Sequence, residues 1–150
     1  MTFWTALIGV FASDYFSKTW IRANYTLGES RPVLGDLLRF THWRNSGAAF
    51  GVFQGATPYL ALISVGCILL AVLMHPRMKG YGVPVLVSLG LIAGGALGNL
   101  IDRVRYGSVT DFISFRFFTP IFNLADSAIV VGAILIGAFF LFFAGGSTER

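Results

Sequence analysis

The chain has 150 residues, of which 55% are hydrophobic and 12% are charged, and its formal net charge is +4. Soluble domains carry about a quarter charged residues, so a soluble fold of this length could not bury so much apolar surface, whereas a bilayer could. The basic residues are scattered along the sequence, so the positive charge does not indicate a nucleic-acid-binding surface. We therefore expect an integral membrane protein that binds no nucleic acid.

Four segments predict membrane-spanning helices, each of which needs about 20 mostly apolar residues. They lie at 3–20, 58–74, 82–101 and 124–143. The first lacks a positively charged leader, and Asp14 and Lys18 interrupt its end, so it is interpreted as a retained helix and not as a cleaved signal peptide. The predicted fold class is all-α, with a single membrane domain over residues 1–150 and four transmembrane helices.

The link between the first two predicted helices is the longest and carries turn signals at Gly28, Arg31-Pro32 and Gly35. Residues 37–50 then mix β-forming and polar residues, in the manner of a short strand or hairpin. We expect this link to form a small extramembrane β-rich element between helices one and two.

Two features of the predicted helices concern packing. Gly90, Gly94 and Gly98 recur every four residues, which places them on one helix face and predicts the close approach of another helix. The single cysteine, Cys67, lies in an apolar run and has no partner for an internal disulfide. We expect it to be a small buried hydrophobic residue.

Polar residues gather at one side of the predicted membrane domain. Ionisable residues in or beside spanning helices are costly and are commonly functional. Because successive helices reverse direction, the long link, the ends of helices one and three and the start of helix four face the same side. The residues there are Asp14, Lys18, Asn45, Asn99, Asp102, Arg103, Asn123 and Asp126. This predicts one polar site near one membrane surface.

The charge count leaves the orientation open. The site side carries Arg22, Arg31, Arg39, Arg44, Arg103, Arg105 and Arg116, and the other side carries Arg77, Lys79 and Arg150. The positive-inside rule, applied literally, would place the site in the cytoplasm. Some of these arginines can be site residues rather than topology signals.

Asp111 and Asp126 are the candidate catalytic pair. Two carboxylates in a poorly hydrated site tend to share one proton, so that one can activate water while the other polarises a carbonyl group. Two structural alternatives remain open: Asp126 can be a helix-capping acid, and Asp111 can pair with an arginine. Asp14 and Lys18 are four residues apart on a predicted helix, which favours an ion pair with a structural role.

Four blocks in this order resemble lipoprotein signal peptidase, also called signal peptidase II. They are DYFSK from Asp14 to Lys18, NSGAAF from Asn45 to Phe50, GNLIDRVRYGSVTDFI over 98–113, and FNLADSAI over 122–129. The third and fourth blocks are highly specific, and the resemblance covers nearly the whole chain.

The resemblance implies a bacterial inner-membrane aspartyl endopeptidase that cuts lipid-modified prolipoproteins on the amino side of the diacylglyceryl-bearing cysteine. It implies both termini in the cytoplasm, a site near the outer leaflet beside membrane lipids, and a β-cradle on the membrane surface. It assigns catalysis to Asp111 and Asp126, substrate binding to Asn45, Asn99, Arg103 and Asn123, and support to Asp14, Lys18 and Asp102. It implies no metal and no cofactor, and we expect a monomer.

Two other classes of protein are compatible with parts of the sequence. A small proton-coupled carrier would explain intramembrane Asp and Lys residues, although carriers place their site near the midplane between repeats, and the sequence has no repeat. A structural subunit would explain the glycines but not the two aspartate motifs. A serine peptidase is disfavoured because the sequence has no GxSxG motif.

Overall fold

The computed structural model describes residues 1–47 and 55–142. The long helices are α1 (Thr2–Asn24), α2 (Thr57–Met74), α3 (Val83–Tyr106) and α4 (Leu124–Phe142), and a short 3-10 helix, η2 (Lys79–Tyr81), precedes α3. The strands are β1 (Ser30–Leu34), β2 (Leu38–Asn45), β3 (Val109–Phe115) and β4 (Phe118–Phe122).

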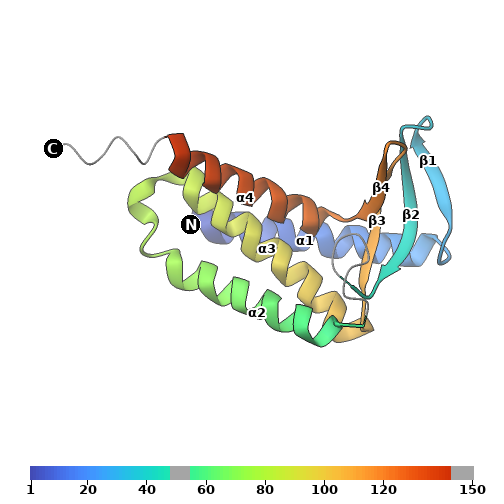
Figure 1. Ribbon diagram of the computed structural model, residues 1–150, viewed down its shortest axis with the longest axis horizontal. Coiled ribbons are helices and arrows are strands. Elements are labelled where there is room, and N and C mark those ends of the chain that lie inside the picture. The colour runs from blue at the N-terminus through green and yellow to red at the C-terminus, as the bar shows by residue number, and fades with distance from the viewer. Residues whose placement is uncertain (48–54, 143–150) are drawn as a thin grey trace.

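The four long helices form a bundle, and the sheet stands across one end of it (Figure 1). Helix α3 is central and packs against α1, α2 and α4. The start of α1 and the end of α4 lie at the end of the bundle away from the sheet (Figure 1). The sheet is therefore at the end of the bundle where α1 and α3 finish and α4 begins.

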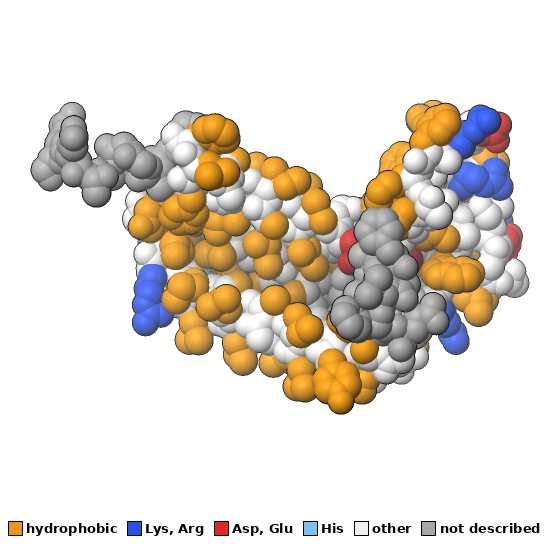
Figure 2. Space-filling view, in the orientation of Figure 1, with side chains coloured by type: hydrophobic (Ala, Val, Ile, Leu, Met, Phe, Trp, Pro, Cys, Tyr) orange, Lys and Arg blue, Asp and Glu red, His pale blue; other side chains and the backbone are white. Residues whose placement is uncertain are grey.

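Within the described residues, α2, α3 and α4 are long and apolar enough to cross a membrane. Helix α1 is not among them, and it carries the charged residues Asp14, Lys18 and Arg22. Hydrophobic side chains cover much of the visible outer surface of the bundle (Figure 2). An exposed apolar surface of this extent suits contact with lipid and not with water.

Helix α1 packs closely on the glycine face of α3. A Cβ atom on Gly90 would lie 2.5 Å from the Phe3 carbonyl oxygen, and one on Gly94 would lie 2.5 Å from the Leu7 carbonyl oxygen. At Gly98, the added Cβ would collide with the Asp14 carboxylate. The predicted packing role of these three glycines is therefore confirmed.

Two further glycines allow the close contact between α3 and α4. A Cβ on Gly95 of α3 would lie 2.5 Å from the Ala125 carbonyl oxygen, and one on Gly132 of α4 would lie 2.7 Å from the Ser88 carbonyl oxygen. Helix α3 is thus held between two helices whose backbones approach it closely on different faces.

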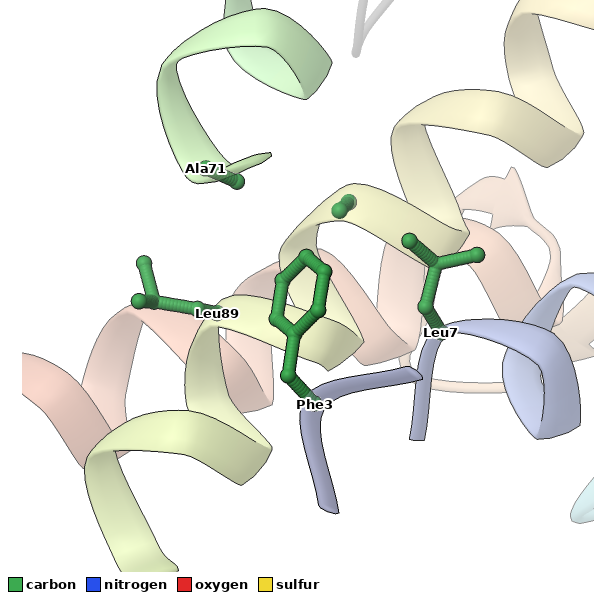
Figure 3. Packing of buried hydrophobic residues seen from close by; sticks show 5 residues of the cluster. Phe3, Leu7, Ala71 and Leu89 are labelled. Atoms are coloured by element: carbon green, nitrogen blue, oxygen red, sulfur yellow. The ribbon is translucent and has the colours of Figure 1, made fainter. Parts of the chain in front are cut away.

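Figure 3 shows the apolar core where α1, α2 and α3 meet, with Phe3, Leu7, Ala71 and Leu89 packed together. Helix α2 contributes little of its surface to this core, since only Ser64 and Ala71 of α2 are buried among the described residues. Cys67 of α2 is exposed. The prediction that Cys67 is buried is wrong, because most of α2 faces outward from the bundle.

The sheet is antiparallel with the strand order β1-β2-β3-β4. The predicted strand in the first link is confirmed as β2, whereas 46–47 lie beyond the strand and 48–50 lie outside the described residues. The turn assigned to Arg31-Pro32 is wrong, because both residues belong to β1, an edge strand that tolerates proline. The element is also larger than predicted, since the link between α3 and α4 supplies half of its strands.

Two helices extend further than predicted, whereas the predicted 58–74 and 124–143 helices agree with α2 and α4 up to Phe142. Helix α1 continues to Asn24 instead of ending at 20, and α3 continues to Tyr106 instead of ending at 101. Gly107, with φ 68°, ends α3 in the left-handed conformation that glycine adopts readily. The two extensions are joined by an ion pair between Arg22 of α1 and Asp102 of α3.

Replacement of Gly94 by alanine should separate α1 from α3, because the new methyl group has no space beside the Leu7 backbone. We expect a loss of about 1–3 kcal/mol of stability. Thermal unfolding in detergent, followed by tryptophan fluorescence, measures the effect. Gly66→Ala on α2 is the matched control, since an added Cβ there meets no atom within 4 Å. Equal Tm values for the two variants would contradict the close packing.

Candidate active site

Asp111 lies inside strand β3, not in a loop, and only 1% of its surface is exposed. Side chains alternate between the faces of a strand, so Asp111 and Val109 share one face while Thr110 and Phe112 share the other. Phe112 packs with Ile21 and Tyr25 of the α1 end. The opposite face therefore presents Asp111 toward the hollow between the sheet and α4.

Asp126 lies in the first turn of α4 and forms a reciprocal cap with Asn123. The Asn123 side-chain oxygen accepts a hydrogen bond from the Asp126 backbone N–H at 2.9 Å, and the Asn123 N–H donates to Asp126 Oδ2 at 3.4 Å. This is the geometry of a capping box. The capping role left open by the sequence is therefore present, and it leaves Asp126 Oδ1 available for other contacts.

Asparagine side chains bridge the two aspartates. Asn123 Nδ2 donates to Asp111 Oδ1 at 2.6 Å, and Asn45 Nδ2 donates to Asp111 Oδ2 at 3.0 Å. Asn99 Nδ2 donates to Asp126 Oδ1 at 2.7 Å, and Asn123 Nδ2 also lies 3.3 Å from Asn99 Oδ1. The carboxylates are thus held in one network that draws on β2, β3, α3 and the start of α4.

A buried charge cluster stands behind this network. Lys18 Nζ lies 2.7 Å from Asp14 Oδ2 and 3.7 Å from Asp102 Oδ2, and it donates to Asn99 Oδ1 at 2.8 Å. Asp14 and Lys18 are 0% and 1% exposed. Asp14 Oδ1 accepts a hydrogen bond from the Ala125 N–H at 2.9 Å, which satisfies one of the free N–H groups at the start of α4. The predicted ion pair is confirmed, and it joins α1 to both α3 and α4.

A cleft of about 520 Å³ contains both aspartates. Its polar lining includes Asn45, Arg103, Asp111, Asp126 and Ser127, and its apolar lining comes from β3, β4 and α4, including Val109, Pro120, Phe122, Ile129, Val130 and Val131. Figure 2 shows a hollow between the helix bundle and the sheet, with acidic side chains near the point where they meet. The cleft is therefore polar where the aspartates lie and apolar along α4.

Arg103 is the cation that lines this cleft. Its Nη1 donates a long hydrogen bond of 3.5 Å to the Asn99 carbonyl oxygen, and its buried Nε has no hydrogen-bond partner among the described residues. An arginine with unused donors can bind carbonyl or carboxylate oxygen atoms of a ligand.

Burial raises the pKa of Asp111 to about 7, and the negative charge of nearby Asp126 acts in the same direction. The hydrogen bonds from Asn45 and Asn123 oppose this shift without cancelling it. A carboxyl group with a pKa near neutral pH can exchange a proton with a reacting group, which is the property required for general acid–base catalysis.

The structure brings together all nine residues that the sequence singled out, which come from five elements and the Asn123 cap. In the described part of the chain Asp111 forms no ion pair within 4.0 Å, so the alternative of an Asp111–arginine pair is not supported. The sequence reasoning missed Arg22, which it placed in a link, and Thr110. A local signal was present for Thr110: 109–115 is rich in β-branched and aromatic residues, which favour a strand, and Gly107 marks the end of the preceding helix.

The fold and site define a polytopic membrane enzyme whose paired carboxylates lie at one end of the helix bundle. The sequence profile of Signal peptidase (SPase) II matches residues 6–142. The chain belongs to the signal peptidase II family and is a peptide-bond hydrolase of the aspartic type.

Curated relatives and solved structures agree with this assignment. The lipoprotein signal peptidase of Syntrophomonas wolfei is 45% identical over 137 residues, which cover 91% of this chain and 90% of that protein. The lipoprotein signal peptidase of Halothermothrix orenii is 42% identical over 123 residues, which cover 82% of this chain and 83% of that protein. A solved structure described as a bacterial membrane enzyme is 33% identical and superposes with a TM-score of 0.89 over 97% of this chain and 90% of its own.

Lys18→Met should destabilise the protein strongly, because it leaves Asp14 without its cation in a buried position. Breaking a buried ion pair typically costs about 3–5 kcal/mol. Thermal unfolding in detergent measures the loss. Lys79→Met in the exposed η2 helix is the matched control and should leave Tm near that of the parent. A Lys18→Met variant as stable as Lys79→Met would show that the cluster contributes nothing to stability.

Asp111→Asn should change stability in a pH-dependent manner. The raised pKa means that folded Asp111 keeps a proton between about pH 4 and pH 7 that the unfolded chain has lost. The parent therefore loses stability as the pH rises through this window, by up to roughly 4 kcal/mol, and Asn removes that loss.

We expect the Tm difference, variant minus parent, to increase from pH 4.5 to pH 8. Asp36→Asn, in the turn between β1 and β2, is the matched control because Asp36 is exposed, and its Tm difference should stay constant over the same range. A constant difference for Asp111→Asn as well would mean that Asp111 titrates alike in the folded and unfolded states.

Proposed function

We propose that this protein removes the signal peptide from bacterial prolipoproteins by cutting on the amino side of a diacylglyceryl-modified cysteine, with Asp111 and Asp126 activating water. The observation that carries the proposal is the cleft itself. Both carboxylates line it, Asn123 bridges them, and its wall continues along the apolar side of α4. The relatives are named lipoprotein signal peptidases, which supplies the substrate class.

The proposed chemistry uses one proton shared by the two carboxyl groups. The ionised carboxylate takes a proton from water while the resulting hydroxide attacks the peptide carbonyl carbon, and the protonated carboxyl group hydrogen-bonds to the carbonyl oxygen. The tetrahedral intermediate then collapses, the C–N bond breaks, and the leaving nitrogen receives a proton from the dyad. No covalent enzyme intermediate forms. Burial of Asp111 and the charge of Asp126 favour the singly protonated pair.

The surrounding polar residues are assigned to substrate binding. Arg103 Nε has no hydrogen-bond partner in the described part of the chain, and we assign Arg103 to a peptide carbonyl of the substrate. Most side-chain hydrogen bonds of Asn45, Asn99 and Asn123 go to the aspartates and to each other. Their part in binding is therefore to form a rigid polar surface at the base of the cleft. The buried residues Asp14, Lys18 and Asp102 hold that polar surface in place from the side of the helix bundle.

The apolar part of the cleft is assigned to the lipid group. Val130 and Val131 are 56% and 47% exposed on α4, next to the turn that carries Asp126. A substrate that slides in from the bilayer along this face keeps its acyl chains in an apolar environment while its peptide bond reaches the aspartates. This route requires the aspartates to lie close to the membrane surface.

We further propose that α1 is the fourth spanning helix. Its 23 residues extend about 35 Å, which exceeds the roughly 30 Å hydrocarbon core of a bilayer. Pairing of Asp14 with Lys18 and of Arg22 with Asp102 lowers the cost of placing charges in this helix. Four crossings put both chain ends on one side, which we assign to the cytoplasm, and the sheet at the outer surface of the inner membrane.

Asp111→Asn and Asp126→Asn should each abolish cleavage, because Asn keeps the shape of the side chain but cannot transfer the proton. We expect a loss of at least about 10²–10⁴-fold in kcat. The assay is cleavage of a diacylglyceryl-modified prolipoprotein in detergent, followed by gel shift, with Asp36→Asn as the active control. Near-normal cleavage by either site variant would overturn the dyad. A folded parent that cuts no lipidated substrate would overturn the proposed function.

A further inference from the structure

Arg22 and Thr110 form a contact that joins the end of α1 to the start of β3. Arg22 Nη1 donates to Thr110 Oγ1 at 2.9 Å and to Asp102 Oδ1 at 3.1 Å. Asp102 Oδ2 accepts a hydrogen bond from the Thr110 backbone N–H at 2.8 Å. The three residues therefore close a ring of hydrogen bonds that holds Thr110 by both its backbone and its side chain.

The ring is rigidly built. Each Nη atom of arginine carries two N–H groups, so Arg22 Nη1 can serve both acceptors at once. The guanidinium carbon lies 4.6 Å from the centre of the Tyr106 ring, and Nη2 donates to Thr19 Oγ1 at 3.1 Å. The Arg22 side chain is 18% exposed and that of Asp102 is 4% exposed. Little water competes for these bonds, which strengthens them.

Arg22 also balances the charge of the buried cluster. Two basic residues, Lys18 and Arg22, pair with two acidic residues, Asp14 and Asp102, so the formal charges of the four side chains cancel. Without Arg22, the cluster would carry an uncompensated negative charge next to the strand that bears Asp111. The arginine thus contacts β3 and also pairs with a carboxylate of the buried cluster.

We propose that Arg22 and Thr110 are positioning residues for Asp111, an inference that rests on the function proposed above. Thr110 precedes Asp111 on β3 and points to the opposite face of the strand. The hydrogen-bond ring therefore fixes the strand from behind while Asp111 faces the cleft. Neither Arg22 nor Thr110 is among the described residues that line the cleft, so we assign neither of them a substrate contact.

A positioning role predicts a specific kinetic effect. Loosening β3 displaces Asp111 from the water and the peptide carbonyl, and a displacement of about 1 Å can cost roughly 100-fold in rate. Substrate binding depends on the cleft walls and on Arg103, and among the described residues the Arg22, Thr110 and Asp102 side chains make no hydrogen bond to the side chains that line the cleft. Loss of the ring should therefore lower kcat and leave KM nearly unchanged.

The test uses the full chain in detergent with a diacylglyceryl-modified, fluorogenic lipopeptide. We expect Arg22→Met and Thr110→Val each to lower kcat by about 10–100-fold, with KM within about threefold of the parent. Thr110→Ser, which keeps the hydroxyl group, should restore most of kcat. The double variant Arg22→Met/Thr110→Val should have a kcat close to that of Arg22→Met alone, because both substitutions break the same ring of hydrogen bonds. Independent effects would instead multiply.

Arg105→Met is the matched control, because Arg105 also stacks near Tyr106, at 5.9 Å, but hydrogen-bonds to Tyr15 instead of to the ring. It should keep parental kcat. If Arg22→Met does not fold, the comparison of Thr110→Val with Thr110→Ser decides the matter.

Folded Arg22→Met and Thr110→Val variants with kcat within twofold of Arg105→Met would overturn the positioning role while leaving the proposed function intact. Equal loss of kcat in Thr110→Ser and Thr110→Val would also overturn it. A folded parent that does not cleave the lipopeptide would overturn the proposed function, and the positioning role with it.

Discussion

The fold depends on the need to compensate a buried ammonium group. Lys18 lies inside the helix bundle with almost no exposure, and an unpaired charge there would cost far more than the protein's net stability. Asp14, Asp102 and Asn99 meet this need from two helices. The same contacts fix the register of α1 on α3, and Asp14 extends them to the first turn of α4. Gly98 leaves the space that the Asp14 carboxylate occupies.

The candidate site lies at the interface between the sheet and the helix bundle. Asp111 belongs to the sheet and Asp126 belongs to the bundle, so their separation is set by how the sheet is attached to the helices. Asn123 makes one attachment by capping α4 and donating to Asp111. The Asp102–Thr110 hydrogen bond makes another on the opposite face of β3. Asp111 is therefore held by hydrogen bonds on both faces of β3, which limits its motion relative to Asp126.

The interface between the sheet and the bundle also places a polar site beside an apolar surface. The cleft is polar at Asp111 and Asp126 and apolar along the α4 wall with Val130 and Val131. The proposed reaction needs water at the two aspartates, and the proposed substrate, which is part peptide and part lipid, needs both environments within a short distance. The raised pKa of Asp111 comes mainly from burial, which removes water from the carboxylate and disfavours its charged form.

Local patterns in the sequence predicted the long helices, although not the C-terminal ends of α1 and α3, and they predicted the glycine face of α3 and strand β2. They also predicted eight of the nine polar residues near the site, because helix ends and the long link can be located from apolar length. Only the folded chain shows that 109–122 forms a hairpin that completes the sheet, that Asp111 projects from its inner face, and that Arg22 reaches Thr110 across 88 positions of the chain. Strand pairing and long-range ion pairs depend on which segments meet in space, and no local pattern of residues encodes that meeting.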